Sequence, residues 1–272
     1  MADAKPITFL SDYGYEDEFA GACRAVIALV APGAPVIDLT HGVPPRDVRR
    51  GAVALLDALP YAPAGVHLAV VDPGVGGERR PVAVRVGTED RILVGPDNGL
   101  LWPAIEALGG PVEAVDVTGS AFRIEPVSAT FHGRDLFAPV AAGLALGAPL
   151  TEAGEAVEPG SLARLELPPA RAEANRLVAE VLHLDRFGNA TLSARGDALA
   201  GGSVSPGDAL SIEVGGRSLG ASFARTFADG GEGEVLLYVD SSRRLALAIN
   251  GGSVAEMLGL GPGSEVTLTV VR

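Results

Sequence analysis

A glycine-rich segment, VVDPGVGGERRP from Val70 to Pro81, carries side chains that could do chemistry. It follows an apolar stretch typical of a buried strand, and it puts the carboxylate of Asp72 shortly before the guanidinium groups of Arg79 and Arg80. In α/β proteins, ligands bind beyond the carboxyl ends of strands, and glycines let the backbone approach them closely. The segment therefore predicts a polar site, with an ordinary Asp-Pro-Gly turn and solvated arginines as the alternative.

Two further segments put titratable side chains where a helix is expected to begin. Asp12, in SDYG, can accept hydrogen bonds from two vicinal hydroxyls, or it can cap the helix that follows. His132, in TFHGRD, lies at a loop-to-helix junction, where the positive end of the helix favours a neutral imidazole that can serve as a base. A histidine at such a position can also be structural, although an Arg and an Asp flank this one.

The C-terminal part of the chain carries a third candidate segment, DRFGN, between two expected strands. Phe187 could stack on a base, while Asp185 and Asn189 could bind polar groups of a ligand. The alternative is a hairpin turn without a binding role. Ser241 and Asn250 also fall near the ends of expected strands in this part of the chain.

The elements that must position these residues form two predicted domains. Residues 1–165 alternate between strand and helix patterns, which predicts an α/β domain with a central sheet flanked by helices. Residues 147–171 are rich in Pro, Glu, Gly and Ala and predict a linker. Residues 172–272 hold short apolar segments separated by turn residues, which predicts an all-β, barrel-like domain. The expected helices are 16–30, 47–59, 102–108 and 136–146, and the expected strands of the second domain are 177–184, 208–214, 233–239, 245–250 and 265–271.

Composition narrows the class of protein. The formal net charge of -13 over 272 residues argues against a nucleic-acid or anionic-membrane partner, because both need a basic surface. The single cysteine, Cys23, excludes an intrachain disulfide, and its place in a helical pattern predicts a small buried side chain. We expect a cytoplasmic protein, since the N-terminus has no secretory leader and no apolar run has transmembrane length.

Seven segments together carry a family resemblance: SDYG, THGVPPRD, VVDPGVGGERRP, GPDNGLL, TFHGRD, DRFGN and AINGGSVAEMLGL, in this order. The chain as a whole resembles the S-adenosyl-L-methionine (SAM) hydroxide adenosyltransferases, which are SAM hydrolases related to the fluorinase and chlorinase. The resemblance covers essentially the full sequence. It implies an N-terminal α/β domain, a C-terminal β-barrel domain, and a homotrimer with substrate sites between subunits.

The resemblance also implies a reaction and its residues. Water or hydroxide attacks the ribose C5′ of SAM, which leaves adenosine and methionine, with SAM as substrate and neither a cofactor nor a metal. The catalytic set implied is Asp72, Arg79 and His132, where the spacing from the aspartate favours Arg79 over Arg80. The implied substrate-binding residues are Asp12, Asp185, Phe187, Asn189, Ser241 and Ile249. Whether Asp72 or His132 takes the proton of the water is left open.

Three other functions remain as alternatives. The first is a SAM- or adenosine-binding protein without turnover, and the second is a metal-dependent phosphoesterase built on Asp12, Asp72, Asp97, His132 and Asp135. The third is halide-dependent adenosyl transfer. The resemblance argues against it, because the halogenases carry tyrosine at the position of Asp72 and serine at that of Gly133. Many related hydrolases also carry a glutamate where this chain has Ala246, which puts one adenine contact in doubt.

Overall fold

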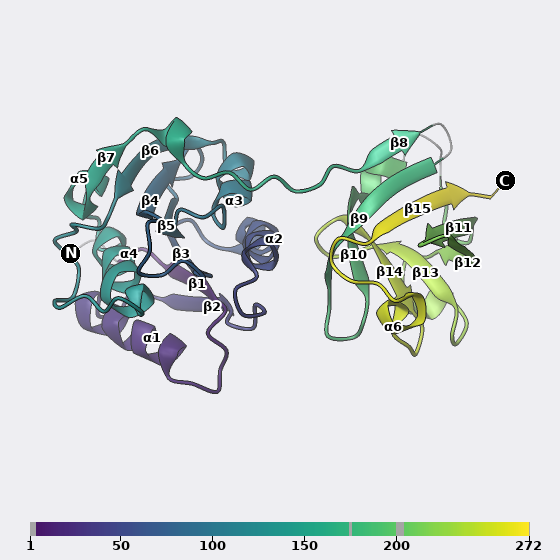
Figure 1. The fold of residues 1–272 in the computed structure, drawn as a ribbon, viewed down its shortest axis with the longest axis horizontal. Helices are drawn as coiled ribbons and strands as arrows, with labels where there is room; N and C mark the ends of the chain where they lie inside the picture. The colour runs from purple at the N-terminus through teal and green to yellow at the C-terminus, as the bar shows by residue number, and fades with distance from the viewer. Residues whose placement is uncertain (1–3, 174–175, 200–203, 272) are drawn as a thin grey trace. The chain divides into compact units, whose positions relative to one another are not determined.

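The computed structural model describes residues 4–173, 176–199 and 204–271 (Figure 1). The chain divides into two compact units, Met1–Glu166 and Leu167–Arg272, and each is described by itself. No helix in the described part of the chain is long and apolar enough to cross a membrane.

The N-terminal unit is built on a mixed sheet with the order β2-β1-β3-β5-β4-β6-β7. Strands β2, β1, β3 and β5 are parallel, whereas β4, β6 and β7 add to them in antiparallel fashion. The pairing of β4 with β5 confirms the hairpin that their alternating sequence suggests. The strand bounds are β1 Ile7–Ser11, β2 Val36–Thr40, β3 Val66–Val70, β4 Pro81–Val86, β5 Ile92–Pro96, β6 Pro111–Asp116 and β7 Glu155–Val157.

Helices cover both faces of this sheet. Successive strand residues point to opposite sides, so apolar side chains on each face pack against helices. Phe9 packs into a core with residues of α1 and α4, while Leu10 packs into a second core with residues of α2 and α3. Cys23 of α1 is fully buried in the first core, as predicted, and burial raises the pKa of its thiol to about 12. The helices are α1 Phe19–Val30, α2 Val48–Ala58, α3 Trp102–Ala107, α4 Ala138–Ala145 and α5 Leu150–Ala153.

Two expectations for this unit are wrong. Helix α1 begins at Phe19, so the acidic run 16–18 precedes the helix instead of forming its first turn. Part of the predicted linker belongs to the domain: α5 buries Leu150 and Ala153, and β7 pairs with β6 at the edge of the sheet. The hydrogen bonds between β7 and β6 join backbone groups and do not depend on the side chains of β7. Composition alone therefore could not distinguish β7 from a linker.

The C-terminal unit is a closed barrel, as predicted. Seven strands follow the order β10-β14-β13-β12-β11-β15-β9, and the pairing of β9 with β10 closes the ring, with β8 added outside β9. Strand β10 follows the DRFGN segment as expected, although the sequence analysis set no bounds for it, whereas β12 was not predicted because its Ser- and Gly-containing sequence has little β-branched character. The bounds are β8 Arg171–Glu173, β9 Arg176–Leu184, β10 Ala190–Arg195, β11 Ala209–Val214, β12 Arg217–Phe223, β13 Val235–Val239, β14 Arg244–Ile249, β15 Glu265–Val270, and for the helix α6, Val254–Leu258.

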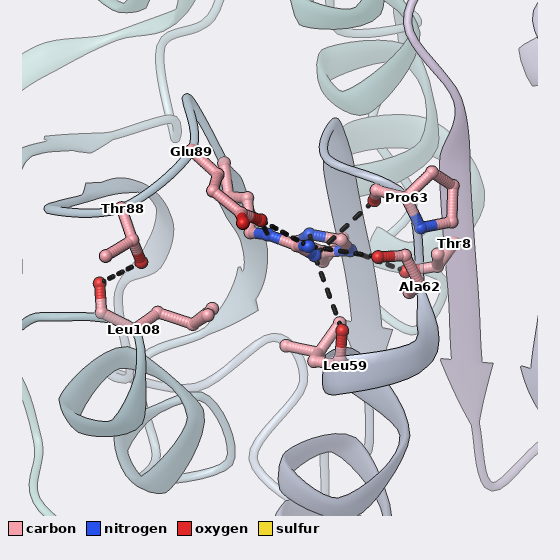
Figure 2. A network of polar contacts seen from close by, with 9 residues as sticks. Thr8, Leu59, Ala62, Pro63, Thr88, Glu89 and Leu108 are labelled. Carbon is pink, nitrogen blue, oxygen red and sulfur yellow. Dashed lines mark hydrogen bonds and ion pairs between the residues drawn. The ribbon is translucent and has the colours of Figure 1, made fainter.

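A buried polar network connects the amino ends of β1, β3 and β5 through Thr8, His67 and Arg91. It lies at the opposite edge of the sheet from the loops that follow these strands. The guanidinium of Arg91, whose Nη1 lies 3.2 Å from His67 Nε2, also donates to backbone carbonyls; Figure 2 shows Leu59, Ala62 and Pro63 around it. Because a guanidinium only donates, Nε2 of His67 must accept, and Nδ1–H donates to Thr8 Oγ1 at 2.8 Å. Burial, and secondly the charge of Arg91, lowers the pKa of His67 to about 4.

This network predicts an acid-sensitive N-terminal unit. Below the usual pKa of 6.5 the unfolded chain binds a proton at His67 that the folded chain does not, so stability falls as pH drops from 6.5 towards 4. As pH falls from 7 to 5, we expect His67 to lower the free energy of unfolding by about 2 kcal/mol. Urea unfolding followed by the fluorescence of the single tryptophan, Trp102, measures it. In His67→Gln that contribution should vanish, and an unchanged pH dependence in this variant would contradict the assignment.

Candidate active site

Three acidic residues gather at the carboxyl edge of the parallel strands. Asp12 follows β1, Asp72 lies two residues after β3, and Asp97 follows β5. Strand β3 pairs in parallel with both β1 and β5, so the loops beyond these strands leave the sheet at the same edge. Asp12 and Asp72 therefore lie at the same edge of the sheet.

The ion pair between Asp72 and Arg79 is the tightest contact at this edge. Arg79 Nε lies 2.9 Å from Asp72 Oδ1 and 3.1 Å from Oδ2, and Nη2 makes a further short contact to Oδ2. Both side chains are almost fully buried, and the guanidinium also lies 5.4 Å from the ring centroid of Phe137. A two-pronged contact of this kind fixes the orientation of both groups.

The glycine-rich loop makes this fold-back geometrically feasible. Turn hydrogen bonds run from Val75 N to Asp72 O and from Gly77 N to Gly74 O. Gly76 has a φ of +75°, and a Cβ there would lie 2.3 Å from the carbonyl oxygen of Ala129. The loop therefore packs its backbone directly on the segment that leads to His132, which a larger residue at position 76 would prevent.

His132 joins the pair through Arg79. Its Nδ1 lies 2.9 Å from Arg79 Nη2, so Nδ1 accepts and the neutral ring carries its proton on Nε2. Burial, and secondly the charge of Arg79, lowers the pKa of His132 below its usual value of 6.5. The residue precedes a π-helical turn, Gly133–Phe137, which confirms the predicted loop-to-helix junction. Turns of this kind recur at functional sites.

Arg80 has different partners from Arg79. Of the two adjacent arginines, only Arg79 contacts Asp72. Its Nε and Nη2 bind Asp97 Oδ2 at 3.0 and 2.6 Å, and it also donates to the hydroxyl and the backbone carbonyl of Ser161. Asp97 Oδ1 in turn accepts from Ala163 N at 2.7 Å. Arg80 thus braces the segment after β7, while Arg79 alone of the two contacts Asp72 and His132.

Asp12 does not cap a helix. Helix α1 begins seven residues later, and Asp12 Oδ2 accepts from the backbone N–H of Arg46 at 2.8 Å. Burial raises the pKa of Asp12; the hydrogen bond from Arg46 opposes this shift, and the charge of Asp72 adds a smaller increase. The effect of Asp72 on this pKa means that the two carboxylates are close enough to interact electrostatically. Asp12 is half-buried. The helix-capping alternative is therefore wrong.

A cavity of about 540 Å³ adjoins the set. Arg79 and His132 line one part of it, and Thr118, Arg123 and Glu125 line another. All of its lining residues belong to the N-terminal unit. Within the described residues, no group of three or more His, Cys, Asp or Glu side chains is arranged to hold a metal ion.

On the barrel, DRFGN forms the β9–β10 turn, so the hairpin prediction is correct. Asp185 Oδ1 accepts from the backbone N–H groups of Phe187 and Asn189, and Oδ2 accepts from the Asn189 amide at 2.8 Å. The ring of Phe187 is 70% exposed, which leaves a face open for stacking. The turn does not exclude a binding role, because the hydrogen bonds within it present Phe187 outwards.

The remaining barrel candidates lie at the two ends of β14. Ile249, 7% exposed, ends the strand near the DRFGN turn, since Ala190 pairs with Leu247. Ser241 lies exposed in the turn before the strand begins. Tyr238 of β13 lies near this turn, and its pKa is raised to about 12 by burial and then by the charges of Asp185 and Asp240. No local motif marks a lone tyrosine on a strand.

Comparison with known proteins places the chain in a family. Residues 7–154 match the SAM hydroxide adenosyltransferase N-terminal domain and residues 179–267 match the C-terminal domain of the same family. The chain is 51% identical over 269 residues to an (R)-S-adenosyl-L-methionine hydrolase of Salinispora tropica, with 99% of each chain covered. It is 44% identical over 279 residues to the protein of the same name from Thermus thermophilus, covering 97% of this chain and 99% of the relative.

Two more distant likenesses agree with this result. A fluorinase of Actinoplanes sp. is 29% identical over 295 residues, covering 98% of this chain and 99% of the relative. A crystal structure of an uncharacterized conserved protein from Thermotoga maritima superposes with a TM-score of 0.91 at 34% identity, covering 97% and 99% of the two chains. Both family domains are matched in order across nearly the whole sequence, and the chain belongs to the SAM hydroxide adenosyltransferase family.

Proposed function

We propose that this chain hydrolyses S-adenosyl-L-methionine to adenosine and L-methionine. The observation that carries the proposal is the joined set of Asp72, Arg79 and His132 at the carboxyl edge of the sheet, in a chain that matches named hydrolases from end to end. Those relatives are named for the (R) epimer at the sulfonium, and we extend that configuration to this chain. The sequence analysis did not predict it.

The reaction needs help at the nucleophile rather than at the leaving group. The water oxygen bonds to the ribose C5′ as the C5′–S bond breaks, and the electron pair leaves with the sulfur of methionine as a neutral thioether. The water must lose one proton in the process. Water is a poor nucleophile at neutral pH, so a group that orients it and accepts its proton accelerates the step.

The hydrogen bonds of the set favour Asp72 as the acceptor of that proton. The Nδ1 lone pair of His132 is occupied by Arg79, so the neutral imidazole offers the water only its Nε2–H. Asp72 is an oxygen acceptor with lone pairs beyond those that Arg79 uses. In this mechanism Arg79 fixes Asp72 and His132, His132 orients the oxygen, and Asp72 accepts the proton.

The family resemblance implies which residues bind the substrate, and the chemistry of their side chains supports these roles. Asp12 suits the ribose hydroxyls, and exposed Phe187 suits the adenine ring. Asp185, Asn189, Ser241 and Ile249 complete the proposed substrate-binding set. Ala246, where many relatives carry glutamate, is fully buried inside β14, so it offers the adenine edge no polar contact.

Three further features belong to the same proposal. We propose a homotrimer with substrate sites between subunits, a cytoplasmic location, and a reaction with SAM as substrate and neither a cofactor nor a metal. The absence of a spanning helix in the described residues is compatible with the location. The chemistry is compatible with the last point, since departure of a thioether from a sulfonium requires no Lewis acid.

The activity itself is tested with the two sulfonium epimers of SAM, supplied separately to chelator-treated protein. We expect adenosine and methionine in equal amounts from the (R) epimer, at the same rate with and without chloride. Chromatography of the products measures this. A 5′-chloro product would indicate halide-dependent transfer, and tight binding without turnover would indicate a binding protein; either would overturn the proposal.

The roles of the two adjacent arginines give a matched pair of variants. Asp72→Asn and Arg79→Gln should each lower kcat by about 100-fold or more, because the first removes the proton acceptor and the second releases both of its partners. Arg80→Gln removes the same charge one residue away and should keep kcat within about threefold of the wild type, since Arg80 contacts Asp97 and Ser161 instead. Equal losses in Arg79→Gln and Arg80→Gln would contradict the assignment.

The lowered pKa of His132 sets the acid limit of the reaction. Protonation would put a hydrogen on Nδ1, facing the donors of Arg79, so activity should fall as pH drops through a value below 6.5. The pH profile of kcat/KM measures this limb. In His132→Asn, whose side-chain oxygen can still accept from Arg79, the limb due to histidine should disappear. A wild-type limb above pH 6.5 would speak against a neutral, donating His132.

A further inference from the structure

Tyr13 lies beside the catalytic set, although neither the sequence motifs nor the proposed mechanism gives it a role. Its ring is held edge-on by Phe9 of β1 at 6.4 Å between centroids and by Phe131 at 5.8 Å, and it is tilted against Phe19 of α1 at 5.9 Å. Phe131 directly precedes His132. Three aromatic neighbours from three segments thus fix the direction in which the hydroxyl points.

The hydroxyl points at the backbone of Gly133, the residue after His132. A Cβ built on Gly133 would lie 2.0 Å from the Tyr13 oxygen and 3.0 Å from Cζ. Gly133 lies in the π-helical turn and is not among the glycines with positive φ, so its backbone conformation does not call for glycine. The glycine is explained by the space that the phenol oxygen takes.

Among the described residues, no hydrogen-bond partner is found for this oxygen. Tyr13 donates its backbone N–H to Ser11 Oγ. Burial, followed by the acidic groups of Cys23, Asp12 and Asp72, raises the pKa of Tyr13 well above its usual value of 10.0, so the hydroxyl keeps its proton. Tyr13 is half-buried and retains open surface. A polar group at an active site in this condition is suited to a water molecule.

We propose that the hydroxyl of Tyr13, held against the backbone of Gly133, binds the attacking water. This inference rests on the proposed function. The hydroxyl can donate to the water oxygen or accept one of its hydrogens, while the proton released on attack goes to Asp72 as above. Tyr13 forms no covalent bond in the reaction. Because it contacts the attacking water, Tyr13 is a further catalytic residue of the same site.

The first test is Tyr13→Phe, which keeps the packed ring and removes only the oxygen. We expect kcat to fall about tenfold, the size of one lost hydrogen bond, while KM for SAM changes less than about twofold. The matched control is Tyr61→Phe: Tyr61 is 76% exposed at the end of a short 3-10 helix, Leu59–Tyr61, and its substitution should leave both constants unchanged. Wild-type kcat in Tyr13→Phe would overturn the hydrogen bond to water. Absence of adenosine with the wild-type chain would instead overturn the proposed function.

A second test addresses the contact with Gly133 directly. Gly133→Ala should lower kcat strongly in the wild-type background and less in Tyr13→Phe, because the closest clash is with the missing oxygen. Additive losses would overturn the contact.

Discussion

The ion pair between Asp72 and Arg79 is the contact on which the rest of the candidate site depends. An aspartate in the loop after a central strand would otherwise be free to point towards solvent, and a histidine in a loop would have no fixed tautomer. The guanidinium binds the carboxylate with two nitrogens and still has a donor left for His132 Nδ1. Because one rigid, permanently charged plane holds both partners, their directions and the proton on His132 Nε2 follow together.

Close backbone packing at two glycines brings the three loops of the site near the guanidinium of Arg79. The loop at Gly76 packs on the carbonyl of Ala129, and the backbone at Gly133 packs on the hydroxyl of Tyr13. In each case the missing side chain is what allows the approach. The loop after β3, the loop before α4 and the loop after β1 thus share one small volume, with a cavity beside it that Arg79 and His132 help to line.

The barrel contributes differently. Its candidate residues lie in turns and at strand ends, where the hydrogen bonds of Asp185 shape a turn that leaves Phe187 exposed. The seven strands of the ring each pair on both sides, whereas β8 pairs only with β9 and has one free edge. What the ring offers a ligand is therefore its turns and the outward side chains beside them, such as Tyr238.

The sequence by itself predicted an α/β part followed by an all-β barrel and placed Asp12 and Asp72 at strand ends, because alternating apolar patterns are local signals. It did not reveal β7, which exists through backbone pairing with the distant β6, or β12, whose Ser- and Gly-containing sequence has little β-branched character. It also favoured Arg79 over Arg80 only by spacing and resemblance, since adjacent residues of one type differ only in where the folded chain directs them. The tautomer of His132 and the neighbour of Gly133 were decided by tertiary structure alone, because both follow from contacts between segments more than fifty residues apart.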